Sequence, residues 1–194
     1  MRYELPEYEG LLKQVAGAAP RVFIMGGIAE EALLFGRVER LHKDLDLLAR
    51  DDELGQLLEQ LAALGLGRFE AVLADSDGRP RLLSGQAGPI EIEIYVASPA
   101  PGGGYQFEVP PQGPAGRLRL FAPADTFQYP ATTIAGITIQ TVSPLALCWM
   151  RAASAQTRNA GVKQASDLAR LAQLRQAFLA GYDEAELKPR IEEI

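Results

Sequence analysis

One stretch, residues 22–48, constrains the fold most strongly, because it reads as two strands around a glycine turn and a short helix. Residues 22–25 form a short apolar run that ends at Gly26, which favours a buried strand followed by a tight turn. Residues 28–35 then have helical character. The second strand, residues 44–47, alternates acidic and apolar side chains. The other segments are placed relative to this unit.

The alternation in the second strand sends Asp44 and Asp46 to one face and Leu45 and Leu47 to the other. Two carboxylates this close repel each other and raise each other's pKa, and a divalent cation removes that cost. A solvated edge strand would show the same alternation, and most surface charges are simply solvated. The order of the neighbouring elements favours a Mg²⁺ or Mn²⁺ site on Asp44 and Asp46.

Gly26 and Gly27 precede the predicted helix. A helix N-terminus offers free backbone N–H groups and a positive dipole end, which suit a polyphosphate. An anion site beside a metal-binding carboxylate pair is the usual arrangement in phosphoryl and nucleotidyl transfer. We therefore expect Gly26 and Gly27 to hold the phosphates of a nucleotide.

The composition is that of an ordinary globular chain of 194 residues, 47% hydrophobic and 23% charged. The formal net charge of -6 argues against nonspecific nucleic-acid binding and favours a cationic or neutral small substrate. No apolar run is long enough to span a bilayer, and the first residues lack an apolar signal core. We expect a cytoplasmic protein without membrane contact. Cys148 is the only cysteine, so no intrachain disulfide can form.

The segments after the central unit switch between helical and strand periods. Residues 54–61 place leucines at helical spacing. Strand candidates at 69–74, 81–83 and 90–96 are separated by turn-forming residues, including 84–88. An antiparallel meander is predicted.

The second half of the chain begins with residues 99–116, whose prolines and glycines predict an irregular loop that could cover a substrate. After further short strands, Ser143 followed by Pro144 is a helix start signal. Helices are predicted over 145–155 and 163–179.

Together these elements predict an α+β fold with a mixed or antiparallel sheet and flanking helices, followed by a C-terminal helical portion. We place the first part at residues 1–142 and the helical part at 143–194. A cleft between the two halves is the expected ligand site.

The strand at 90–96 carries a second acidic alternation, in which Glu91, Glu93 and Tyr95 share one face and isoleucines occupy the other. A half-exposed strand with solvated carboxylates is the interpretation that composition favours.

A family resemblance gives these residues a further interpretation. Gly26-Gly27-x-Ala29, followed by Arg40-x-His42-x-Asp44-Leu45-Asp46-Leu47, resembles the signature of the polymerase-beta-type nucleotidyltransferases. Within that superfamily it is most similar to the small aminoglycoside and lincosamide nucleotidyltransferases. The resemblance covers about residues 20–96.

The resemblance implies a third acidic residue on a neighbouring strand, which either completes the metal site or takes the proton from the attacking hydroxyl. Glu91 and Glu93 both fit, and the sequence does not choose between them. The family commonly has aspartate there, so glutamate is a departure. Arg40 would neutralise phosphate charge, and His42 either orients the turn or acts in the site. Lys163 is implied to approach the nucleotide phosphates, and the alternative is an i, i+4 ion pair with Asp167.

The resemblance implies a magnesium-dependent enzyme that transfers NMP from an NTP, with ATP favoured, to a hydroxyl of a small molecule such as an aminoglycoside or lincosamide. One alternative is a toxin-type nucleotidyltransferase that modifies tRNA or a protein. Another is a catalytically silent nucleotide-binding member of the fold. The two aspartates argue against the silent member, and the acidic charge argues mildly against a tRNA acceptor, which stays open. The sequence does not indicate an oligomeric state.

Overall fold

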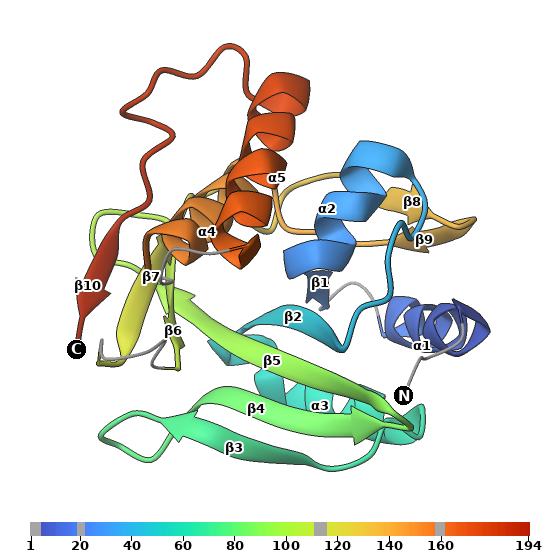
Figure 1. The fold of residues 1–194 in the computed structure, drawn as a ribbon. Coiled ribbons are helices and arrows are strands. Elements are labelled where there is room, and N and C mark those ends of the chain that lie inside the picture. The colour runs from blue at the N-terminus through green and yellow to red at the C-terminus, as the bar shows by residue number, and fades with distance from the viewer. Residues whose placement is uncertain (1–4, 19–21, 111–115, 158–161) are drawn as a thin grey trace.

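The computed structural model describes residues 5–18, 22–110, 116–157 and 162–194 (Figure 1). The helices are α1 (Leu5–Gly17), α2 (Gly26–Phe35), α3 (Leu54–Ala63), α4 (Pro144–Thr157) and α5 (Val162–Phe178), with a 3₁₀ turn, η1 (Asp51–Glu53), before α3. The strands are β1 (Phe23–Ile24), β2 (Asp44–Arg50), β3 (Phe69–Ala74), β4 (Pro80–Ala87), β5 (Ile90–Pro99), β6 (Tyr105–Val109), β7 (Leu118–Ala122), β8 (Thr132–Ile134), β9 (Ile137–Ile139) and β10 (Ile191–Glu193).

One mixed sheet has the strand order β1-β2-β5-β6-β7-β10, and the β3-β4 hairpin joins it through β4, which pairs with β5. β2 and β5 are parallel, whereas the other pairs of this sheet are antiparallel. β8 and β9 form a separate hairpin. This mixed sheet with flanking helices, followed by α4 and α5, confirms the predicted α+β fold class.

The helices α2, α4 and α5 lie together on one side of the sheet, and α3 lies behind β4 and β5 in the view of Figure 1. α2 contacts β2, α4 contacts β7, and α2 and α4 contact each other. The predicted leucine stripe of α3 is confirmed, because Leu54, Leu57 and Leu61 are buried. No helix in the described ranges is long and apolar enough to cross a membrane.

β5 is the strand around which the core is built. β2 and β4 flank most of its length, and β6 pairs with its last two residues. Ile90, Ile92 and Ile94 are at most 1% exposed, as the period of two in a strand requires. Burying each such side chain contributes about 1.5–3 kcal/mol. The glutamates between these isoleucines are therefore presented from a firmly packed strand.

Two loop predictions were wrong. Residues 99–116 are not wholly irregular, because β6 lies among them. Its residues, Tyr105–Val109, alternate between aromatic or apolar and polar side chains. The glycines at 102–104 all have positive φ, so they form the turn that lets β6 return beside β5 and β7. The predicted turn at 84–88 is also shorter, because β4 continues to Ala87.

The C-terminal part combines an expected helix start with an unexpected strand. Ser143 caps α4, since its Oγ accepts the backbone N–H of Ala146 at 3.1 Å. After α5 the chain returns to the sheet as β10, antiparallel to β7. Three residues are too few for a periodic signal, so this strand was not predicted. The division of the chain at residue 142 stays a prediction.

Candidate active site

The carboxylates of β2 and β5 lie side by side because these two strands are parallel neighbours. The register places Asp44 beside Glu91 and Asp46 beside Glu93. Leu45, on the other face of β2, is fully buried and holds the strand in place. The sequence predicted the two acidic pairs separately, and the parallel register brings all four side chains to one part of the sheet.

Asp46 is a strongly perturbed carboxylate. Burial, together with Asp44 and Glu93, raises its pKa to about 8, and Arg151 opposes that rise only in part. Its carboxylate also lies against the start of α2, because a Cβ built on Gly26 would be 2.1 Å from Oδ2 of Asp46. A concentrated acidic site therefore adjoins the glycine turn.

The structure distinguishes the two glutamates of β5. Tyr95 donates a hydrogen bond to Oε2 of Glu93 at 2.8 Å, and Glu93 also interacts with the carboxyl group of Asp46. Burial, then Glu91 and Asp44, raises the pKa of Glu93 despite the hydrogen bond from Tyr95. Glu91 instead accepts a hydrogen bond from Ser84 of β4 at 2.7 Å. Glu93 is therefore the glutamate that lies beside Asp46.

The glycine turn is built to bring α2 close to its neighbours. Gly26 has a φ of 63°, in the left-handed region that glycine tolerates best. A Cβ on Gly27 would be 2.6 Å from Nη2 of Arg40 and 2.6 Å from Cε1 of His42. The first N–H groups of α2 have no partner within the helix, as at every helix start. The turn thus combines tight packing with potential anion donors.

Gly26→Ala is expected to destabilise the protein more than Gly136→Ala does. Both glycines have positive φ, so both variants incur backbone strain of about 1–2 kcal/mol. Only Gly26 has an obstructing neighbour, Asp46, whereas a Cβ on Gly136 meets nothing within 4 Å. Overpacking should therefore add about 1–3 kcal/mol at Gly26. Urea unfolding of both variants measures this, and equal losses would contradict a packed Gly26–Asp46 contact.

His42 is buried, with 3% of its surface exposed, beneath the glycine turn. Its Nε2 lies 3.1 Å from Oε2 of Glu31, an ion-pair distance without hydrogen-bond geometry. Glu31 also accepts the backbone N–H of Glu39 at 2.8 Å, and Nε of Arg40 lies 3.6 Å from its Oε1. Burial raises the pKa of Glu31, but these partners outweigh it and leave the pKa lowered. His42 and Arg40 are thus anchored to α2 through Glu31.

Sequence reasoning missed a buried ion-pair cluster that joins three helices. Arg151 of α4 lies 2.6 Å from Glu30 of α2 and 2.5 Å from Asp167 of α5. Arg170 is a further cation, 3.8 Å from Glu30. Burial raises the pKa of Glu30 in spite of these cations. The available signal was a pair of glutamates, Glu30 and Glu31, inside an otherwise apolar helix.

Lys163 lies near the start of α5, but its side chain is outside the described part of the structure. Its contact with nucleotide phosphates stays a prediction. Asp167, four residues further on, is buried and ion-paired with Arg151. Tyr8 was also missed, and its hydroxyl donates to the backbone carbonyl of Asp44 at 2.5 Å. That bond ties α1 to the start of β2.

A cleft of about 390 Å³ opens beside the acidic pair of β2, and Tyr95, but neither Glu91 nor Glu93, is among its described lining residues. Its polar end is lined by Gly26, Gly27, Asp44 and Asp46, with Arg40, His42 and Lys43 beside them. Its other walls come from β6, β7 and α4 and are largely apolar. The cleft thus joins an anion-binding turn and an acidic pair to a hydrophobic surface.

No family model and no curated protein sequence matches the chain. Solved structures do match. The solution structure of the antibiotic-resistance factor ANT(2'')-Ia matches with 21% identity and a TM-score of 0.57, and the match covers 90% of this chain and 92% of that chain. In complex with adenylyl-2''-tobramycin it matches with 22% identity and a TM-score of 0.57, covering 90% and 98%. The lincosamide antibiotic adenylyltransferase LnuA, lincomycin-bound, matches with 14% identity and a TM-score of 0.58, covering 90% and 99%. This chain has the polymerase-beta-type nucleotidyltransferase fold.

The acidic pair of this nucleotidyltransferase fold suits a divalent cation bound together with a nucleotide. Within the described ranges, no three acidic, histidine or cysteine side chains already form a metal cage. Mg²⁺ commonly binds one or two carboxylates and completes its shell with substrate phosphates and water. Asp44 and Asp46, beside the start of α2, offer that partial set. The raised pKa of Asp46 is consistent with it, because a cation would offset the repulsion.

Proposed function

We propose that this protein is a Mg²⁺-dependent nucleotidyltransferase that moves NMP from an NTP, with ATP favoured, to a hydroxyl of a small molecule. The supporting observation is the half-buried Asp46 carboxylate, held beside Asp44 and Glu93 and directly against Gly26. That arrangement joins metal ligands to an anion-binding helix start. Residues 1–142 would supply the catalytic groups, and residues 143–194 would close the cleft.

The reaction assigns each of these residues a task. The acceptor oxygen attacks the α-phosphorus, the bond from that phosphorus to the bridging oxygen breaks, and pyrophosphate leaves. Glu93 takes the acceptor proton. Asp44 and Asp46 hold the cation, which when bound neutralises phosphate charge. The N–H groups that follow Gly26 and Gly27 bind phosphate oxygens.

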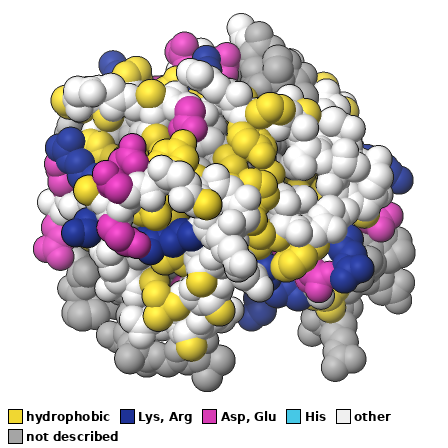
Figure 2. Space-filling model, turned by 90° about the horizontal axis from the view of Figure 1, so that it is seen from above, with side chains coloured by type: hydrophobic (Ala, Val, Ile, Leu, Met, Phe, Trp, Pro, Cys, Tyr) yellow, Lys and Arg dark blue, Asp and Glu magenta, His cyan; other side chains and the backbone are white. Residues whose placement is uncertain are grey.

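A small acceptor fits better than a macromolecule. Of the proteins of similar fold, one is described in complex with adenylyl-2''-tobramycin and another as lincomycin-bound, which supports a hydroxyl compound of that size. The face above α2 and α5 mixes cationic and acidic side chains, as Figure 2 shows, and forms no basic stripe there. Nucleic-acid binding depends on such a stripe.

Transfer of label from [α-³²P]ATP tests the proposal. With Mg²⁺, the wild-type protein should label an aminoglycoside or a lincosamide and release pyrophosphate. The other three NTPs and tRNA are included in parallel, and EDTA should abolish labelling. Labelling of tRNA alone would mean that the acceptor is tRNA and not a small molecule. Absence of transfer to any acceptor would contradict the proposal.

Glu93→Gln and Glu91→Gln are expected to differ sharply. If Glu93 accepts the proton, Glu93→Gln should lower the single-turnover rate by about 10² or more while NTP affinity changes little. Glu91→Gln perturbs one hydrogen bond with Ser84 and should cost only about 0.5–1.5 kcal/mol of stability. Rates measured at saturating NTP decide this. Two near-wild-type rates would remove Glu93 from the mechanism.

A further inference from the structure

The cleft has a continuous apolar wall formed by β6 and β7. Their register pairs Phe107 with Leu120 and Val109 with Leu118, and all four side chains line the cleft. The ring of Phe107 meets that of Tyr95 edge-on, with centroids 6.0 Å apart. Because the Tyr95 hydroxyl bonds the glutamate of the acidic site, the apolar wall begins directly beside that site.

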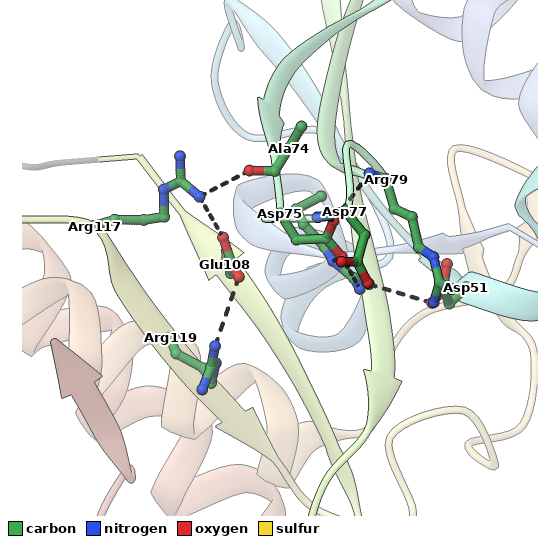
Figure 3. Close-up of polar contacts among 9 residues, drawn as sticks. Asp51, Ala74, Asp75, Asp77, Arg79, Glu108, Arg117 and Arg119 are labelled. Atoms are coloured by element: carbon green, nitrogen blue, oxygen red, sulfur yellow. Dashed lines mark hydrogen bonds and ion pairs between the residues drawn. The ribbon is translucent and has the colours of Figure 1, made fainter. Parts of the chain in front are cut away.

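The charged residues of the same two strands point away from the cleft. Side chains alternate between the faces of a strand, so Glu108 and Arg119 lie opposite the apolar wall. Glu108 lies 3.2 Å from Arg117 and 3.8 Å from Arg119. Figure 3 shows Glu108 between these two arginines. These charges pair with one another behind the wall, and they do not line the cleft.

Few carboxylates remain in the cleft to receive a cationic ligand. The charged residues that line it, within the described part of the chain, are Glu30, Asp44, Asp46, Arg40, Lys43 and Arg151. Glu30 is already paired with Arg151, and the two aspartates belong to the proposed metal site. Glu93 adjoins the cleft through its hydrogen bond with Tyr95 and is the proposed proton acceptor, so it is also engaged. Each further ammonium group of a ligand would be buried without a partner, which is unfavourable.

The opposite side of the cleft continues the apolar surface. Leu147 and Met150, one helical turn apart on α4, line it. A nucleobase here would place its hydrogen-bonding edge against aliphatic side chains, whereas an alkyl group of an acceptor would not.

We propose that the acceptor is a hydroxyl compound with an alkyl face and at most one positive charge. Its alkyl part lies between β6, β7 and α4 while its hydroxyl reaches the acidic site. This inference rests on the proposed function for the position of the hydroxyl, and it excludes polyamine acceptors from the preferred substrates.

Calorimetric titration tests the inference without requiring turnover. The probes are lincomycin, which has an alkyl chain and one amine, and tobramycin, which has several amines. Each is titrated into full-length protein with Mg²⁺ and a non-hydrolysable ATP analogue. Lincomycin should bind at least about tenfold more tightly than tobramycin, a difference of one decade in Kd.

Val109→Glu introduces a carboxylate into the apolar wall, and Val72→Glu is its matched control. Val72 is 52% exposed on β3 and does not line the cleft. Val109→Glu should weaken the binding of lincomycin and strengthen the binding of tobramycin, each by about tenfold. Val72→Glu should change neither affinity. Met150→Glu, at a partly buried position on α4, should shift the preference in the same direction if Val109→Glu does not fold.

The outcomes distinguish a failure of the inference about the acceptor from a failure of the proposed nucleotidyl transfer. Tighter tobramycin binding by the wild type, or no binding of either probe, overturns the inference. A change confined to the affinity for the ATP analogue in Val109→Glu also overturns it, because the wall would then hold the nucleobase. Lincomycin binding with the expected shifts, but without label transfer, upholds the apolar site and contradicts the proposed function.

Discussion

Asp46→Asn is expected to lower nucleotidyl transfer by about 10³ or more, since a metal ligand contributes several kcal/mol of transition-state stabilisation. The same substitution should stabilise the protein at high pH when no divalent cation is added. Burial, Asp44 and Glu93 raise the pKa of Asp46 from 3.8 to about 8 in the folded chain. The folded state therefore holds this proton more tightly than the unfolded state does.

The sign of the pH effect follows from that difference. Between about pH 4 and pH 8 the folded state binds more protons, so the free energy of unfolding falls as pH rises through this window. Asparagine cannot ionise, so Asp46→Asn should lack this fall and should exceed the wild type by a few kcal/mol at pH 9. Urea unfolding at pH 5 and pH 9 measures it.

Two comparisons make this result specific. Asp77→Asn, an exposed position in the β3–β4 turn, should leave the pH dependence unchanged. Mg²⁺ with an ATP analogue should raise the free energy of unfolding of the wild type at pH 9 but not that of Asp46→Asn. Ligand binding stabilises only a folded state that binds the ligand. Parallel pH curves for wild type and Asp46→Asn would contradict the perturbed carboxylate, and retained transfer would contradict its catalytic role.

Arg151→Met is expected to cost about 3–5 kcal/mol of folding stability, since it removes a cation that is ion-paired with two buried carboxylates. Glu30 and Asp167 are 2% and 3% exposed. Adding Glu30→Gln and Asp167→Asn to Arg151→Met should recover much of that loss, because the buried charges disappear with the cation. Urea unfolding of the single and triple variants measures both effects.

Arg37→Met is the matched control for this arginine. The Arg37 side chain is 73% exposed and pairs with Glu39 at the surface, so its loss should change stability by about 1 kcal/mol or less. A similar small effect for Arg151→Met would mean that the three-helix cluster contributes little. No recovery in the triple variant would mean that the loss arises from packing rather than charge.

The site elements that the sequence predicted are those with strong local signals. Asp44 and Asp46 share a face because alternation is a property of any strand. The glycine turn was predicted because Gly26 adopts positive φ without strain, which few other residues do. Local stereochemistry sets these features, whatever packs around them.

The features that were missed depend on contacts between distant segments. β6 was taken for loop because proline and glycine surround it, yet pairing with β7 orders its five residues. Arg151 gave no local signal, since its partners lie on α2 and α5. The hydrophobic periodicity of one segment does not predict ion pairs or strand pairs with distant segments.

Local patterns predicted the acidic strand, the glycine turn and the α+β class, and the family resemblance added two candidate glutamates. Only the tertiary structure favoured Glu93 over Glu91 as the partner of Asp46, because the parallel register and the bonds to Tyr95 and Ser84 orient the two side chains differently. It also placed an apolar wall beside the acidic site. Alternation assigns a side chain to a face, but the neighbouring strand decides what that face meets.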